Sequence, residues 1–268
     1  MTNKLITFED QLRAIRVPRN MTALMQLLQR YAQAGHWLWQ TDSVSANKLD
    51  KLIPKLDKQY NICRDVPARA YAKSKGQASV HLVVFPVDNT VRYWLASTKG
   101  RHGLAQHPFP GASPVRDLTL RGQAISYKNY ELLRLPKKSL HEGEQISDVT
   151  WTWRVNPLRV REHQAFIVQR ARQHDLNGLL AEIASLEMMP MFSATRRQVQ
   201  NLRFEAQKIW GKFNKTRSNE LGPFKTLPIM QKLKIYPPMP LTLFNLWLSV
   251  QSPEPDLEAK VNRDHDQP

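Results

Sequence analysis

Cysteine is almost absent from this sequence, since Cys63 is the only one in 268 residues. One cysteine excludes an intramolecular disulfide framework and fits the reducing cytoplasm. The N-terminus also lacks the apolar core of a signal peptide, and the most apolar late run, Leu241 to Val250, is too short to span a bilayer of about 30 Å. We therefore expect a cytoplasmic protein with no membrane partner.

Acidic residues are in short supply. Asp and Glu number 23 against 39 Lys and Arg, which gives a formal net charge of +16 and a pI near 10.1. The hydrophobic fraction of 41% is sufficient for a core. A surplus of positive charge attracts polyanions, and nucleic acid is the commonest of these. An anionic membrane surface or an acidic protein partner are the alternatives.

Sequence motifs that indicate a catalytic or metal-binding site are also missing. The sequence contains no His-x-x-x-His, Cys-x-x-Cys or Gly-x-Ser-x-Gly motif, and nothing around Cys63 is typical of a nucleophile. A nuclease would need acidic and histidine side chains such as His81, Asp88 and Glu131 to converge in one pocket. We expect no metal and no cofactor, and we favour a binding protein over an enzyme.

The clearest structural signal is the stretch from Ala78 to Thr98. Its first half is apolar except for His81, with Val80 and then Leu82, Val83, Val84 and Phe85 in succession, which is typical of a strand covered on both faces. Asp88-Asn89 then has turn chemistry, and apolar residues alternate from Val91 to Leu95. This pattern predicts a β-hairpin at the centre of a sheet.

Other segments have recognisable periods. The expected strands are His36–Thr41, Ile125–Leu135 and Val149–Val155. The expected helices cover residues 7–16, 20–35, 45–60 with a kink or break at Pro54, 157–174, 176–186, 193–215 and 241–248. Prolines and glycines predict irregular structure from Lys99 to Gln123, and residues 137–147 read as a polar loop.

These elements predict an α+β fold, with N-terminal helices, a mainly antiparallel sheet of about five strands and a helical C-terminal half. The predicted division is an α+β sheet domain over residues 1–156, a basic helical region over 157–250 and a disordered tail over 251–268. Whether the helical region packs on the sheet as one domain is left open.

The strongest candidate site is the basic helix from Ser193 to Lys215 with the residues just after it. Its apolar stripe lies opposite several cations, which could neutralise successive phosphates without reading the base sequence. The candidate nucleic-acid-binding residues are Arg196, Arg197, Arg203, Lys208, Lys212, Lys215 and Arg217. A solvated helix face is the alternative interpretation.

A second candidate is the loop Thr98–Gly103, in which Lys99 and Arg101 lie beside Gly100 and Gly103. Such a loop could cradle a phosphate, although a turn between strands would have the same composition. Tryptophans on predicted strands could stack bases, but core packing is the more common role of aromatic residues there. They are Trp37, Trp39, Trp94, Trp151 and Trp153.

Two segments, Gly122–Pro136 and Trp151–Arg154, resemble uncharacterised accessory proteins of conjugative plasmids and integrated mobile elements. The resemblance runs in order from the Gly-His-Trp-Leu-Trp segment through the Ser-Thr-Lys-Gly loop to the basic helices, over about two-thirds of the chain. It implies a bacterial mobile DNA element as the setting and no mechanism.

Three hypotheses follow from these observations. The first is a non-enzymatic accessory protein of a plasmid or mobile element that binds nucleic acid, DNA more than RNA. The second is a protein-interaction module that inhibits or adapts the conjugation or replication machinery. The third, and the least favoured, is a nuclease-like enzyme.

Overall fold

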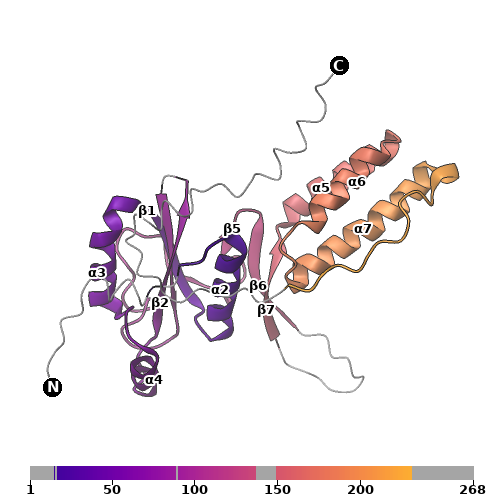
Figure 1. Cartoon of the computed structure of the whole chain (residues 1–268). Helices are drawn as coiled ribbons and strands as arrows, with labels where there is room; N and C mark the ends of the chain where they lie inside the picture. Colours follow the sequence, from indigo (N-terminus) through magenta and orange to yellow (C-terminus); the bar gives the residue numbers. More distant parts are fainter. Residues whose placement is uncertain (1–14, 16, 89, 137–148, 231–268) are drawn as a thin grey trace, which may run out of the picture. The chain divides into compact units, whose positions relative to one another are not determined.

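The structure is a computed structural model that describes residues 15, 17–88, 90–136 and 149–230 (Figure 1). The helices expected at 7–16 and 241–248, the loop at 137–147 and the tail lie outside the described residues. The fold is α+β, with two antiparallel sheets of four and three strands. The chain forms two compact units, which divide between Val115 and Arg116 rather than after residue 156; Leu28–Ala34 belongs with the second unit.

The predicted hairpin forms the centre of the first sheet. Strands β2 (Val80–Val87) and β3 (Thr90–Ser97) pair antiparallel, and β3 also pairs with β1 (Leu38–Ser45). The strand order is β2-β3-β1-β4, where β4 is the short strand Arg116–Asp117. Neighbouring residues of β2 that point to opposite faces are both buried, which confirms the expectation of a strand covered on both sides.

Helix α2 (Met21–Gln33) begins and ends where the sequence predicts. The Asn20 side chain accepts a hydrogen bond from the Ala23 amide at 2.9 Å, and Gly35 follows the helix with φ of +88°. The next helical segment comprises η1 (Ala46–Lys48) and α3 (Leu49–Tyr60). Pro54 does not end α3, because the buried face of the helix packs on the first sheet along its whole length.

Helix α4 (Val66–Ser74) was not predicted. Its start has a recognisable signal, since Asp65 accepts a hydrogen bond from the Ala68 amide at 2.8 Å and a proline occupies the first turn. Arg69 fastens the helix to the first unit. Its guanidinium donates hydrogen bonds to the carbonyl oxygens of Arg64, Val80 and Ile62.

The second sheet has the order β5-β6-β7, formed by Ser126–Tyr127, Tyr130–Pro136 and Val149–Val155. The prediction of one strand over Ile125–Leu135 was wrong. That segment is a tight hairpin which turns at Lys128, whose φ is +48°. A left-handed residue interrupts an extended strand without disturbing the apolar pattern, so alternation alone did not reveal the turn.

Three helices follow the second sheet: α5 (Pro157–Arg172), α6 (Leu176–Glu187) and α7 (Ser193–Phe213), and then the short η2 (Lys215–Arg217). Asn156 and Asp175 cap the first two. Helices α5 and α7 lie side by side in Figure 1, coloured salmon and orange. No helix among the described residues is both long and apolar enough to cross a membrane.

Candidate nucleic-acid interface

Helix α7 is fixed to β7 by side-chain hydrogen bonds at its N-terminal end. The hydroxyl of Thr152 accepts from the Ala194 amide at 3.3 Å and from the Ser193 hydroxyl at 2.9 Å. The carboxamide of Gln198 both accepts from the amide of Val155 and donates to its carbonyl, at 2.8 and 3.0 Å. Phe192 occupies the N-cap position and Ser193 is the first helical residue. The hydrogen bonds to β7 set the orientation of the start of the helix.

The two faces of α7 differ in composition. The side chains of Val199, Leu202, Ala206 and Trp210 are at most 3% exposed and form the buried stripe. The opposite face is solvent-exposed and carries the cations Arg197, Lys208 and Lys212, together with Phe204, which is 56% exposed. At a rise of about 1.5 Å per residue, Arg197 and Lys212 lie about 22 Å apart along the helix axis. The face is a straight row of positive charge with one aromatic ring in it.

Among the described residues, no acidic side chain makes an ion pair with this row, although Glu205 lies on the same helix three residues before Lys208. Every Asp and Glu between Pro157 and Met230 is already engaged with a side chain other than those of Arg197, Lys208 and Lys212. The pairs are Glu162 with Arg159, Asp175 with Arg170, Glu182 with His163, Glu187 with Arg203, Glu205 with Gln164, and Glu220 with Arg217.

Many cations of this helical part are left without an ion pair among the described residues. They are Arg161, Arg172, Arg196, Arg197, Lys208, Lys212, Lys215 and Lys225. Surface ion pairs contribute little to stability, so the fold loses little when these cations have none. The consequence of the missing pairs is a positively charged surface. Unpaired cations on a rigid surface are available to an external anion, and their number exceeds that of the paired ones.

Two of the predicted residues are used within the fold. Arg203 is 1% exposed; it donates to the carbonyl oxygen of Lys225 at 2.6 Å, and its guanidinium carbon lies 4.5 Å from the centre of the Phe224 ring. Arg217 is exposed, but its guanidinium bonds Glu220 at 2.7 Å. Arg203 therefore holds the segment after α7 against the helix and does not face solvent.

Arg172, which does not belong to the predicted basic helix, lies close to the C-terminal end of the row. The guanidinium of Arg172, at the end of α5, lies 5.6 Å from the centre of the Phe213 ring, and the ammonium of Lys212 lies 5.8 Å from the same ring. The C-terminal ends of α5 and α7 thus place two cations, Arg172 and Lys212, beside the same aromatic ring. Sequence spacing could not reveal this neighbour, because the two residues come from different helices.

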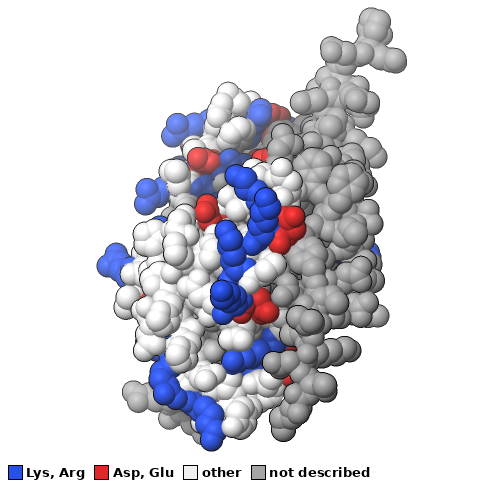
Figure 2. All heavy atoms as spheres, turned by 90° about the vertical axis from the view of Figure 1, so that its left-hand side faces the viewer, with Lys and Arg blue, Asp and Glu red and all other residues white. Residues whose placement is uncertain are grey.

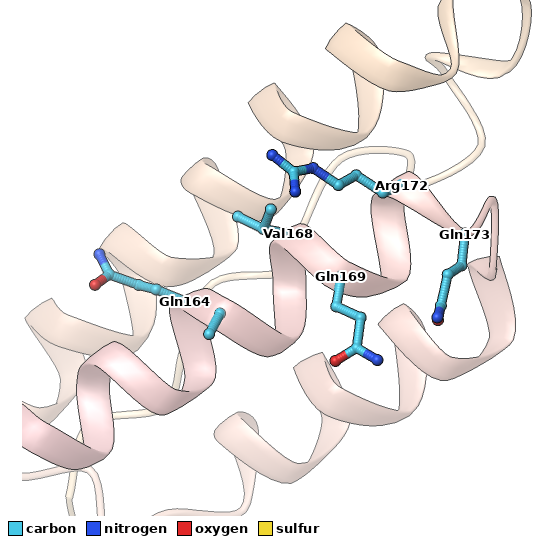
Figure 3. Close-up of a pocket in the computed structure, with 6 residues that line it drawn as sticks. Gln164, Val168, Gln169, Arg172 and Gln173 are labelled. Atoms are coloured by element: carbon cyan, nitrogen blue, oxygen red, sulfur yellow. The ribbon is translucent and has the colours of Figure 1, made fainter.

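Two hollows lie along the helices of this part of the chain. Figure 3 shows a hollow of about 540 Å³ along α5, lined by Gln164, Ala165, Val168, Gln169, Arg172 and Gln173. A smaller hollow of about 340 Å³ lies beside the start of α7, where Arg196 and Arg197 face Thr226 and Leu227. Among the described residues that line either hollow there is no carboxylate, histidine or cysteine.

The Thr98–Gly103 loop packs against its own chain. A Cβ on Gly100 would lie 2.7 Å from the Ala78 nitrogen, and one on Gly103 would lie 2.4 Å from the Ala78 Cβ. The amides of Arg101 and His102 donate to Gly76 and to the Gln106 side chain, at 2.9 and 3.0 Å. The glycines are thus explained by close packing, and those two amides are unavailable to a phosphate. The side chains of Lys99 and Arg101 are exposed.

The tryptophans serve the interior of the protein. Trp39, Trp94, Trp151 and Trp153 are all at most 5% exposed, and Trp37 is half-buried. The interpretation that bases stack on these four buried tryptophans is therefore wrong, because a base cannot reach a ring face that is already packed.

The residues considered for catalysis do not gather. His81 and Asp88 lie near opposite ends of β2, which at about 3.3 Å per residue separates them by about 23 Å. Burial and the neighbouring Asp57 carboxylate raise the pKa of the Cys63 thiol to about 12, so the thiolate is scarce at neutral pH. No group of three or more metal-binding side chains occurs in the part of the chain that the structure describes.

Comparisons of this chain with protein-family models, with curated proteins and with solved structures found no match.

Proposed function

We propose that this protein is a non-enzymatic nucleic-acid-binding protein whose principal interface is the outer face of α7. The observation that carries the proposal is the imbalance in the helical part, where every described carboxylate is engaged elsewhere while Arg197, Lys208 and Lys212 make no ion pair. Such a row neutralises phosphates and releases their counterions, whatever the base sequence.

The wider setting is also part of the proposal. The resemblance to accessory proteins of conjugative plasmids supports DNA rather than RNA as the ligand, a cytoplasmic location and a role in replication or transfer. A surface that binds phosphates without contacting base edges suits a protein that must act on many DNA sequences.

The test reverses the charge of the row in the triple variant R197E/K208E/K212E. We expect duplex affinity at about 50 mM salt to fall by at least ~100-fold, and the slope of log K against log salt to become shallower by about 2 to 3. Fluorescence anisotropy with labelled duplex DNA over a salt series measures both quantities.

The matched control is K51E/K55E/K58E on α3, which changes the net charge equally at three exposed lysines of another helix. Figure 2 shows the side of the molecule that carries α3 and α4, where red carboxylates lie among the blue cations. We expect a much smaller loss from this control. Equal losses in both variants, or no DNA binding by the unaltered protein at low salt, would overturn the proposal.

A protein-interaction module is the second candidate, and one observation favours it. The outer face of α6 exposes Leu180, which is 42% exposed, and Met188 just after the helix is 69% exposed. The exposed charge on the same face, Glu187, is paired with Arg203. An exposed apolar helix face is typical of a docking surface. If R197E/K208E/K212E retains DNA binding while L180E/M188E loses a partner from the transfer or replication machinery, this second function replaces the first.

A further inference from the structure

The C-terminal end of α4 and the Thr98–Gly103 loop form one continuous surface. The amide of Ala78 donates to the Arg101 carbonyl at 2.8 Å, and the Arg101 amide donates to Gly76 at 2.9 Å. The Arg101 guanidinium donates to the carbonyl oxygen of Lys75, also at 2.8 Å. The loop therefore closes the end of the helix, and we call the exposed side chains of Tyr71, Lys73, Lys75 and Arg101 the α4–loop surface.

This surface lies in a part of the chain without acidic residues. The sequence contains no Asp or Glu from residue 66 to 87 or from 89 to 116. Lys73, Lys75 and Arg101 make no ion pair with any described residue. Asp65, the acid that precedes α4, caps the opposite end of the helix. The cations of the α4–loop surface therefore keep their positive charge without a carboxylate partner in the described part of the chain.

An aromatic ring stands within this positive surface. Tyr71 is 67% exposed, and the ammonium of Lys75 lies 5.6 Å from the centre of its ring. The helix that carries the ring is fastened by Arg69 to three carbonyl oxygens, so the fold fixes where Tyr71 leaves the backbone. An exposed aromatic ring beside cations is the combination that stacks an unpaired base while neighbouring phosphates are neutralised.

We propose that the α4–loop surface binds single-stranded nucleic acid, with one base stacked on Tyr71 and the adjoining phosphates held by Lys75 and Arg101. The inference rests on the proposed function for its ligand class, but it concerns a different surface and adds a preference. A duplex hides the faces of its bases, so only a single strand can use the ring. The row on α7 provides no such distinction, because it reads phosphate charge alone.

The test compares Y71A, Y71F and the unaltered protein by fluorescence anisotropy, using oligothymidine of about 20 nucleotides and a duplex of equal length. We expect Y71A to bind the single strand about 5- to 150-fold more weakly, and Y71F, which keeps the ring, to bind within about twofold of the unaltered protein. Duplex affinity should not change in either variant. V66A, which shortens another exposed apolar side chain of α4, is the matched control and should bind both ligands normally.

Circular dichroism should show native helix content in Y71A, because Tyr71 is exposed. Unchanged single-strand affinity in Y71A, or an equal loss for both ligands, overturns the stacking site. If R197E/K208E/K212E loses duplex binding while Y71A behaves normally, only this inference fails. If the unaltered protein binds neither ligand at low salt, the proposed function fails and the stacking site fails with it.

Discussion

The outer face of α7 and the Thr98–Gly103 loop are both basic, and the sequence marks both as candidate phosphate-binding sites. In the structure they differ in what the fold requires of them. The loop needs its glycines to approach Ala78 and uses the amides of Arg101 and His102 in internal hydrogen bonds. The row on α7 makes no ion pair within the described part of the chain, and Lys212 alone contacts an aromatic ring, that of Phe213 at 5.8 Å.

This difference teaches how to separate structural from functional residues in a basic protein. A group that already has internal partners is explained by the fold, and its removal should change stability. A charge that makes no ion pair within the described part of the chain stays available to an external anion, and if such an anion binds there, removal of the charge should change binding. Each of the following predictions tests one side of this distinction, beginning with the largest expected effect.

Gly103→Ala should destabilise the protein by about 1–3 kcal/mol, because the new Cβ would lie 2.4 Å from the Ala78 Cβ and 3.0 Å from the Ser97 hydroxyl oxygen. Urea denaturation followed by circular dichroism measures the loss. Gly211→Ala in α7 is the matched control; the nearest side-chain atom lies 3.6 Å away, and stability should rise by about 0.5–1 kcal/mol. If Gly103→Ala has normal stability, close packing does not explain this glycine, and the loop becomes a candidate phosphate-binding site again.

Arg203→Ala should lower stability without changing DNA affinity, whereas Arg197→Ala should lower DNA affinity without changing stability. Loss of Arg203 removes a hydrogen bond to Lys225 and a 3.2 Å ion pair with Glu187, so stability should fall by about 2 kcal/mol. DNA affinity measured below the unfolding transition should not change. Arg197→Ala should leave stability within about 0.5 kcal/mol and weaken DNA binding several-fold. Thermal unfolding and fluorescence anisotropy on both variants check the prediction. A loss of DNA affinity in Arg203→Ala together with a loss of stability in Arg197→Ala would contradict the distinction between structural and binding residues.

Cys63 should make a small contribution to stability that disappears at alkaline pH. Burial and Asp57 raise the pKa of its thiol in the folded protein to about 12, above the value of about 8.5 for an unfolded chain. The folded state therefore keeps a proton that the unfolded state releases, and the stabilisation is complete below pH ~8.5 and is lost as the pH rises toward 12. Cys63→Ala should flatten the decline in urea midpoint between pH ~8 and ~10, relative to the unaltered protein. An identical decline in both proteins would contradict the assignment.

Much of the fold follows from local patterns. The apolar run from Val80 to Phe85 and the turn at Asp88 predict the central hairpin, because burial on both faces requires continuous apolar residues. Asn20 and Gly35 mark the ends of α2 for equally local reasons. The hairpin at Lys128 and helix α4 were missed, because a single left-handed residue and a nine-residue helix leave little periodicity to detect.

The candidate site depended more strongly on tertiary contacts. The spacing of α7 correctly separates its apolar stripe from Arg197, Lys208 and Lys212, since helix geometry alone decides which residues share a face. Spacing could not show that Arg203 is buried, or that Arg172 reaches Phe213 from another helix. It also could not place Arg101 at the end of α4, because residues about 26 positions apart meet only when the chain folds.

By itself, the sequence determined the class of fold, the positive charge and the composition of each helix face, because these depend on residue identity and on the local period of the backbone. Only the tertiary structure decided which charges are neutralised, which glycines are needed for packing and which aromatic ring stays exposed. Those properties depend on distances between residues far apart in the chain, and Coulomb and packing energies are set by distance rather than by sequence order.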